Sequence, residues 1–200
     1  MSFNTSLSKP SSQLWTQIQW QPSELQINKF IKLQSLLKKW NEKINLTRLI
    51  DGDDYWITHV FDSLWPIKEE LKNQSKNMQC VDVGSGCGFP GLALAIALPN
   101  TKVTLIEAIK RKTFALKAIS EELELNSQII ICQERVEIIG QQSKFRGKFD
   151  LAMARAVAKT PIVCEYLIPL LNKQGQALIY QGKWTLEEQV ALNKALLILK

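Results

Sequence analysis

Two stretches in the first third of the chain have hydrophobic residues at helical spacing. The first follows Ser23, a suitable N-cap residue, and its apolar positions recur every three to five residues. These positions are Leu25, Phe30, Leu33, Leu37, Trp40 and Ile44. The second is expected to begin at Asp53 or Asp54 and to end at Pro66, because proline cannot continue a helix. Its apolar side carries Trp56, Val60, Phe61 and Leu64.

The segment before these helices, residues 1–22, is polar. It is rich in Ser, Gln and Asn and is interrupted by Pro10 and Pro22. Such a composition is typical of a loosely held arm. The residues by which it could dock on the rest of the protein are Trp15, Ile18 and Trp20.

From Cys80 onward the pattern changes to apolar strand, turn and helix, repeated. We expect strands near 79–83, 102–107, 128–132, 149–154 and 176–181. Helices are expected near 91–98, 110–124, 134–141, 161–172 and 185–198. Strands that alternate with helices are typical of βαβ units. The predicted fold class is therefore α/β, a doubly wound and mostly parallel sheet with an N-terminal helical extension.

These elements divide the chain into three parts. We predict an N-terminal arm over residues 1–22, a helical subdomain over 23–73 and a larger α/β domain over 78–200. The residues from 196 to 199 are all apolar and need a surface to pack on. This leaves open that further C-terminal strands of the sheet belong to a longer chain.

Composition narrows the classes of protein. With 200 residues and 46% apolar side chains, the chain suits one ordinary core and is neither disordered nor fibrous. The four cysteines include no CxxC pair and the one histidine is His59, so the usual zinc patterns are absent and no metal is expected. The given sequence does not open with a charged segment followed by an apolar one, and no apolar run approaches the length of a membrane span. We therefore expect a cytoplasmic monomer with reduced cysteines and no membrane partner.

The net charge is positive, because 25 lysines and arginines exceed 19 acidic residues and give +6. This bias suits a polyanion such as nucleic acid, and it suits plain solubility about equally well. Basic residues gather on the outer side of the first helix, at Lys29, Lys32, Lys38, Lys39 and Lys43. A solvated helix face is the commoner meaning of such a set.

The strongest motif is a glycine turn between a strand and a helix, VDVGSGCGFPG over residues 81–91. Glycine permits positive φ and lets a ligand approach the backbone, while the following helix offers free N–H groups. Glu107 ends the next strand, 23 positions after Gly84, where a carboxylate can accept both hydroxyls of a ribose. A structural role for Glu107 at a helix N-terminus is the alternative and is compatible with the first.

The chain resembles class I S-adenosylmethionine-dependent methyltransferases, and more narrowly the bacterial small-subunit ribosomal RNA methyltransferase G family (RsmG, or GidB). The resemblance covers most of residues 38–183 and depends on several blocks in a fixed order. They are WNEKINLT at 40–47, HVFDSL at 59–64, the glycine turn with its Phe-Pro-Gly, KRK at 110–112, RVE at 135–137 and RAVA at 155–158. The turn alone indicates only the superfamily, whereas the full order of blocks indicates the family.

This resemblance implies a Rossmann-like methyltransferase fold, the cofactor S-adenosyl-L-methionine and a 16S rRNA (guanine-N7)-methyltransferase. The implied substrate is N7 of a guanine of the guanine-527 type in the 530 loop of 16S ribosomal RNA, in the small ribosomal subunit or its assembly intermediate. Cofactor contacts are expected from Gly84, Ser85, Gly86, Gly88, Phe89, Glu107, Val136, Glu137 and Arg155.

The same resemblance and the charge pattern suggest which residues meet the RNA. Candidates for positioning the base are Arg155, His59, Asp62 and Asn45. Phosphate contacts are expected from Lys39, Lys43, Arg48, Lys110, Arg111 and Lys112. No general base is assigned, because N7 of guanine carries a lone pair and no proton and can attack the methyl group directly. For His59 and Asp62, a local structural hydrogen bond is an equal alternative.

Some positions depart from the family's pattern. The strand-end acid is Glu107 where the family more often has aspartate, a longer side chain that should still meet a ribose. After the fifth strand the family tends to have lysine before glycine, whereas here Gln181 precedes Gly182 and the charge falls at Lys183. No role is carried over to that lysine. The family also continues into a final pair of strands that is not found before residue 200.

Three other functions stay open on the sequence. A class I methyltransferase that acts on another RNA, a protein or a small molecule is supported by the glycine turn alone. A nicotinamide dinucleotide oxidoreductase is opposed by the GxGxG spacing, since such folds use GxGxxG. A noncatalytic RNA-binding module would require that no cofactor binds.

Overall fold

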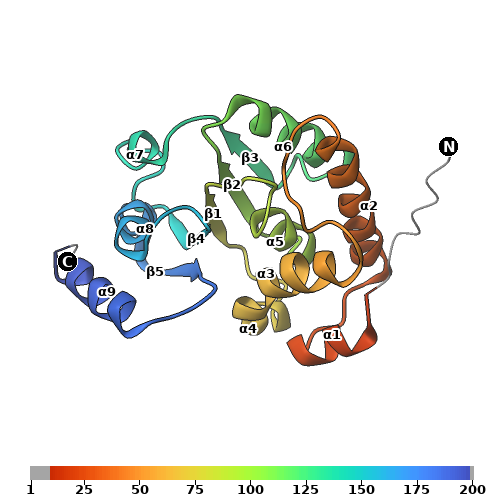
Figure 1. Ribbon diagram of the computed structural model, residues 1–200, viewed down its shortest axis with the longest axis horizontal. Helices are drawn as coiled ribbons and strands as arrows, with labels where there is room; N and C mark the ends of the chain where they lie inside the picture. The colour runs from red at the N-terminus through yellow and green to blue at the C-terminus, as the bar shows by residue number, and fades with distance from the viewer. Residues whose placement is uncertain (1–9, 199–200) are drawn as a thin grey trace.

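Five apolar segments form the strands of one sheet in the computed structural model, which describes residues 10–198 (Figure 1). They are β1 (Gln79–Val83), β2 (Lys102–Ile106), β3 (Ile129–Cys132), β4 (Phe149–Arg155) and β5 (Leu171–Tyr180). Their order across the sheet is β3-β2-β1-β4-β5, and every neighbouring pair is parallel. The predicted α/β fold is confirmed, and the carboxyl ends of its strands meet at one edge.

Both faces of the sheet are apolar because successive residues of a strand point to opposite sides. Cys80 of β1 and Leu105 of β2 belong to the core on one face, while Val81 and Ile106 belong to the core on the other. This is the pattern of a parallel sheet that helices cover on both sides.

The helices after β1 follow the strands as predicted. On one face of the sheet, α5 and α6 contribute to the core, and α7 and α8 do so on the other. A 3-10 turn, η3, leads from α8 into β5, and α9 packs on α8 (Figure 1). The bounds are α5 (Gly91–Ala97), α6 (Lys110–Glu122), α7 (Val136–Ile139), α8 (Thr160–Leu167), η3 (Ile168–Leu170) and α9 (Leu186–Ile198).

The first predicted helix is present as α2 (Glu24–Asn41) and begins with a capping box formed by Ser23 and Gln26. The Gln26 amide also donates to two carbonyls at the end of α5, at 3.1 and 3.0 Å. Gln26 is therefore buried, while Leu25, which was expected on the inner side, is 66% exposed. The prediction for Leu25 is wrong because an amide that satisfies two free carbonyls of a helix end takes the inward position.

Residues 10–22 do not form the expected loose arm. They contain a helix, α1 (Ser12–Ile18), and its rings pack on the core. The docking residues are the predicted ones, Trp15, Ile18 and Trp20. Trp15 and Trp20 meet edge to face with ring centroids 5.7 Å apart, and burial of such large apolar rings holds the segment in place. The rest of the predicted arm, residues 1–9, lies outside the described residues.

The second predicted helix begins at the expected place but has a wider turn. It is a π-helix, η1 (Asp54–Phe61), followed directly by α3 (Asp62–Leu64), η2 (Trp65–Ile67) and α4 (Lys68–Lys72). The α-helical turn ends at Leu64, before Pro66 as predicted, but a further short helix follows at once. Pro66 lies in the first turn of η2, where a missing N–H group leaves no hydrogen bond unmade.

The last strand begins earlier than expected, because the helix predicted over 161–172 ends with η3 and β5 starts at Leu171. A shift of register between Phe149 and Leu151 lets this extension pair with β4. Gly175 is required there, since a Cβ at this position would lie 2.6 Å from the carbonyl oxygen of Phe149. At the end of α9, Leu196, Leu197 and Ile198 are exposed, and the remainder of the predicted apolar stretch lies outside the described residues.

The hydrophobic core joins the N-terminal helices to the sheet. Side chains of α1, α2 and η1 belong to the same buried cluster as those of α5 and β2. The division into an arm, a helical subdomain and an α/β domain stays a prediction. Within residues 10–198, no helix is both long enough and apolar enough to cross a membrane.

Candidate active site

The glycine turn follows β1 and lies at the carboxyl edge of the sheet. Gly84, Gly86 and Gly88 have φ angles of 69°, 57° and 98°, a region that L side chains rarely adopt. The N–H groups of Gly84 and Ser85 both donate to the carbonyl of Ile106, at 2.8 and 3.1 Å. The open backbone of the turn is therefore fixed against β2.

Asp82 holds the turn and the next helix together, a role that the sequence analysis missed. Its Oδ2 accepts from the N–H of Gly91 at 2.9 Å, and its Oδ1 is buried without a hydrogen-bond partner among the described residues. Burial raises the pKa of Asp82 to about 7. At Gly91 a Cβ would lie 2.3 Å from the Leu105 side chain, so only glycine lets α5 begin this close to the sheet. The signal for Asp82 was an acid inside an otherwise apolar buried strand.

Glu107 lies between the glycine turn and α6 and is 6% exposed. Its Oε2 accepts from the N–H of Gly86 at 3.0 Å, and its Oε1 accepts from the N–H of Ile109 at 2.8 Å. Ile109 is the N-cap residue of α6, so the structural role expected for Glu107 is present. A carboxylate has about four acceptor positions, which leaves room for ribose hydroxyls as well.

Glu107 also lines a cavity of about 350 Å³ at this edge. The predicted cofactor residues in its wall are Gly84, Glu107, Val136 and Glu137. The Tyr166 hydroxyl donates to Oε1 of Glu137 at 2.9 Å. Ile109 and Val157, which were not among the predicted site residues, also line this cavity with partly exposed apolar side chains.

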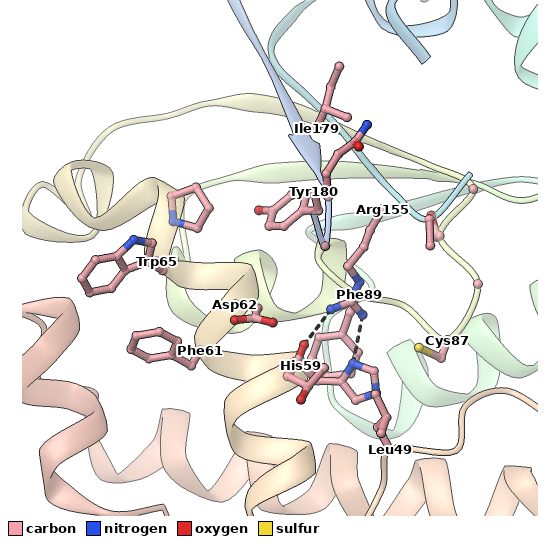
Figure 2. Close-up of a pocket in the computed structure, with 18 of the residues that line it drawn as sticks. Leu49, His59, Phe61, Asp62, Trp65, Cys87, Phe89, Arg155, Ile179 and Tyr180 are labelled. Atoms are coloured by element: carbon pink, nitrogen blue, oxygen red, sulfur yellow. Dashed lines mark hydrogen bonds between the residues drawn. The ribbon is translucent and has the colours of Figure 1, made fainter. Parts of the chain in front are cut away.

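A larger cavity of about 750 Å³ shares Gly84 with the smaller one (Figure 2). Its wall comes from the glycine turn, the ends of β4 and β5, and the helices η1 to η2. The predicted residues that line it are His59, Asp62, Gly84, Ser85, Gly86, Phe89, Lys112 and Arg155. Gly88 lines neither cavity, and a Cβ there would lie 2.3 Å from the Leu92 side chain.

Three contacts hold Arg155 at the end of β4. Its Nη1 donates to the carbonyl of Thr58 at 2.9 Å, and its Nη2 donates to Nδ1 of His59 at 2.9 Å (Figure 2). Its Cζ lies 5.7 Å from the ring centroid of Phe89. A guanidinium has five N–H groups, so donors remain for a ligand. Arg155 thus brings a fixed cation to the wall of the larger cavity.

His59 is neutral in this arrangement. Burial and, less strongly, the charge of Arg155 lower the pKa of His59 to about 4. Because a guanidinium only donates, Nδ1 accepts from Arg155, and Nε2 carries the proton and donates to Oγ1 of Thr47 at 3.0 Å. The imidazole also stacks on Phe89 with centroids 4.6 Å apart. Neither ring nitrogen keeps a free lone pair, so His59 cannot serve as a base here.

The two other candidates for positioning a substrate differ in location. Asp62 lines the larger cavity, and burial raises the pKa of its carboxyl group, an effect that the charge of Arg155 opposes. Asn45 is exposed on the loop after α2 and lines neither cavity, so its role stays a prediction. Ser63, next to Asp62, donates to the backbone carbonyl of His59. The His59 side chain bonds to Thr47 and Arg155 and forms no described hydrogen bond with Asp62.

The predicted RNA-binding cations lie on two segments that meet. The end of α2 and the loop after it carry Lys39, Lys43 and Arg48, and the first turn of α6 carries Lys110, Arg111 and Lys112. Trp40 and Phe114 join the segments edge to face with centroids 5.8 Å apart, and Nζ of Lys43 lies 5.3 Å from the Trp40 centroid. Phe114, which no sequence pattern indicated, is 67% exposed beside these cations.

Comparisons with known proteins agree on one family. A protein-family model described as "GidB: rRNA small subunit methyltransferase G" matches residues 26–200. A Prochlorococcus marinus protein named "Ribosomal RNA small subunit methyltransferase G" is 54% identical over 192 residues, which cover 96% of this chain and 76% of that relative. A Synechococcus protein with the same name is 49% identical over 191 residues, which cover 96% of this chain and 79% of that relative.

Solved structures share the fold at lower identity. A protein from Corynebacterium glutamicum matches with a TM-score of 0.54 at 15% identity, covering 83% of this chain and 78% of that one. An O-methyltransferase from Bacillus cereus, in complex with SAH, matches with a TM-score of 0.53 at 18% identity, covering 70% of this chain and 61% of that one. At this level of identity the likeness shows the fold alone.

Proposed function

The chain belongs to the rRNA small subunit methyltransferase G family, and we propose that it methylates N7 of a guanine in the 530 loop of 16S ribosomal RNA. Membership makes it an enzyme that depends on S-adenosylmethionine. The observation that carries the proposal is that two cavities share Gly84. One has the carboxylate of Glu107 in its wall and the other has Arg155. A nucleoside cofactor in the first would therefore meet a second ligand in the other.

The residues of the two cavities fit the three parts of S-adenosylmethionine. Glu107, buried and with acceptor positions to spare, suits the two ribose hydroxyls. The apolar side chains of Ile109 and Val157 suit the faces of the adenine ring. The carboxylate of the methionine end can pair with Arg155 beside the glycine turn. When bound, S-adenosylmethionine supplies a methyl group on a positively charged sulfur.

The proposed chemistry needs no general base, and the site offers none at His59. N7 of guanine has an in-plane lone pair and no proton to lose. His59 is neutral, and both of its nitrogens are engaged with Arg155 and Thr47. Catalysis then depends on holding the base in line with the methyl group, which can contribute roughly 7–11 kcal/mol in well-oriented systems.

Arg155 is the residue that we assign to orienting the guanine. The O6 atom lies next to N7 on the same edge of the base and accepts hydrogen bonds. A guanidinium that donates to O6 would leave the N7 lone pair free to attack. Because Thr58 and His59 already fix two of the guanidinium nitrogens, little further ordering would be needed on binding.

The joined basic segments of α2 and α6 are the proposed contact for the RNA backbone. They comprise Lys39, Lys43, Arg48, Lys110, Arg111 and Lys112. The exposed ring of Phe114 among them offers a surface on which an unstacked base can lie. Lys112 also lines the larger cavity, so this surface continues to the site. We propose that the substrate is an assembly intermediate or an exposed loop of the small subunit, since proteins read unstacked bases most readily.

The proposal is tested by methyl transfer from labelled S-adenosylmethionine to small ribosomal subunits that lack this modification. The site of transfer is mapped with chemistry that cleaves RNA at 7-methylguanosine. We expect label at one guanine of the 530 loop. Label at another position in the RNA would overturn the assigned site. Cofactor binding without label in the RNA would favour a methyltransferase with another substrate.

A further inference from the structure

One end of the larger cavity is aromatic and takes no part in the cofactor contacts described above. Phe61 and Trp65 stack with ring centroids 5.2 Å apart and planes inclined by 30°. Both line the cavity, and Trp65 is 43% exposed. Nζ of Lys68 lies 5.1 Å from the Trp65 centroid. A partly exposed ring with a cation beside it is a surface that suits a nucleobase and its phosphate.

A carboxylate lies between this aromatic pair and Arg155 in Figure 2. Asp62 lines the same cavity, and it forms no hydrogen bond or ion pair with a described residue. Burial raises the pKa of its carboxyl group, and Arg155 opposes this effect only in part. Hydrogen-bond donors brought by a ligand would stabilise the ionised form. The folded chain thus leaves a carboxylate acceptor unused beside the site of chemistry.

Guanine has complementary polar groups on two edges. O6 and N7 accept on one edge, while N1–H and the 2-amino group donate on the opposite edge. If N7 faces the glycine turn and O6 faces Arg155, the donor edge turns toward the side of Phe61 and Trp65, where Asp62 lies. The cation of Arg155 would then face the acceptor O6, and the carboxylate of Asp62 would face the donors N1–H and the 2-amino group. Adenine would present an acceptor nitrogen to the carboxylate and would be repelled.

We propose that Asp62 accepts hydrogen bonds from N1–H and the 2-amino group of the target guanine, and that Trp65, backed by Phe61, stacks on the same base. Asp62 and Trp65 are three positions apart on one helical run, so their side chains emerge as neighbours. Reading of an extruded base by its donor edge and by an aromatic face is a general solution for enzymes that act on bases. The inference rests on the proposed function and adds the residues that select guanine.

The test compares methyl transfer to small subunits reconstituted with guanosine or with inosine at the target position. Inosine keeps N7, O6 and N1–H and lacks only the 2-amino group. For the unaltered chain, inosine should lower kcat/KM roughly tenfold, as expected for a lost hydrogen bond to a charged group. Asp62→Asn should lower kcat/KM for guanosine roughly 10- to 100-fold. In the Asp62→Asn variant, replacing guanosine with inosine should lower kcat/KM by less than about threefold, because the two changes remove the same contact.

Matched variants separate this subsite from general damage. Asp54→Asn removes an exposed carboxylate of η1 that lines neither cavity, and it should leave both rates unchanged. Trp65→Phe should retain activity, whereas Trp65→Ala should lose roughly tenfold through lost stacking. Binding of S-adenosylmethionine, measured by calorimetry, should be the same in all of these variants.

Two results would overturn the subsite. One is unchanged transfer by Asp62→Asn, and the other is an equal loss from inosine with and without the Asp62 carboxylate. If the unaltered chain places no label on guanosine subunits, the proposed function fails and the subsite with it. If only the subsite is wrong, the unaltered chain would label guanosine subunits normally, and the effect of inosine would not depend on the Asp62 carboxylate.

Discussion

Nη2 of Arg155 donates a hydrogen bond to Nδ1 of His59 at 2.9 Å, across 96 positions of sequence. His59 donates in turn to Thr47, so a loop before η1, the π-helix itself and the end of β4 are linked through one imidazole. Phe89 contacts both the guanidinium and the imidazole. Four segments of the chain therefore fix one cation before any ligand binds, which is the preorganisation that a positioning role requires.

Arg155→Lys should separate the charge of this residue from its geometry. A lysine ammonium cannot reproduce the planar fork that reaches both the Thr58 carbonyl and His59. We expect kcat/KM for methyl transfer to fall roughly 100-fold, because small misplacements of an orienting group have effects of that size. Arg155→Ala should lose at least as much, with thermal unfolding checked in both variants. Lys159→Ala, an exposed change four positions later, should be neutral, and normal turnover by Arg155→Lys would contradict the role.

The ribose contact of Glu107 can be tested without disturbing the fold. Calorimetry should compare the affinity for S-adenosylhomocysteine (SAH) with the affinity for an analogue that lacks both ribose hydroxyls. We expect the analogue to bind roughly 10- to 100-fold more weakly, the effect of hydrogen bonds to a charged group. Equal affinities would exclude the contact.

Substitution of Glu107 provides the complementary measurement. Glu107→Ala should weaken cofactor binding by roughly 1.5–3 kcal/mol, and removal of the ribose hydroxyls should then have little further effect. The variant also removes the acceptor for the N–H groups of Gly86 and Ile109, so its free energy of unfolding has to be measured beside its affinity. The coupling between variant and analogue isolates the ribose contact from that structural loss.

The basic segment that opens α6 should contribute to the salt dependence of RNA binding. Each phosphate contact makes the slope of log affinity against log salt steeper, that is, more negative, by about 0.7–0.9. The double variant Lys110→Ala, Arg111→Ala should therefore bind small-subunit RNA more weakly, and its slope should be less steep by about 1.4–1.8. Lys76→Ala, Lys173→Ala is the matched control, since both residues are exposed near the amino ends of strands, away from the carboxyl edge. An equal loss in both double variants would argue against a specific surface.

The sheet is predictable from the sequence because each strand is a short apolar run followed by a turn signal. Both bounds of β1 agree with the prediction, and those of β2 and β3 agree within one residue. The failures occur where a contact distant in sequence decides the outcome. Leu25 points outward because Gln26 faces inward and donates hydrogen bonds to two carbonyls at the end of α5. The hydrophobic periodicity of α2 gives no sign of these two carbonyls.

The site residues that could be predicted from the sequence are those at the ends of strands. Gly84, Glu107 and Arg155 each follow or end a strand, and parallel strands bring such positions to one edge. The bond between His59 and Arg155 depends on the π-helical turn of η1, which no local signal in the sequence predicts. The aromatic end of the larger cavity was missed because Pro66 was expected to end the helix, which left Trp65 unassigned although Phe61 lies four positions before it.

Two buried groups near the glycine turn change their proton affinity in opposite directions on folding. Burial lowers the pKa of His59 from 6.5 to about 4, so between these values the unfolded chain binds more protons and the free energy of unfolding rises with pH. Burial raises the pKa of Asp82 from 3.8 to about 7, so in that range the folded chain binds more protons and the free energy of unfolding falls as pH rises. In the unaltered chain the two effects largely cancel between pH 4 and 6.5.

Removal of either group should therefore expose the effect of the other. Between pH 4 and 6.5, the free energy of unfolding of His59→Gln should fall with rising pH relative to the unaltered chain, and that of Asp82→Asn should rise. Each slope should change by about 1 kcal/mol per pH unit, close to the value for one proton. Urea denaturation without cofactor measures these slopes, which matter more than absolute stability because both substitutions also remove hydrogen bonds. Asp54→Asn, an exposed change, should leave the slope unaltered, and parallel curves for all four proteins would contradict the assigned shifts.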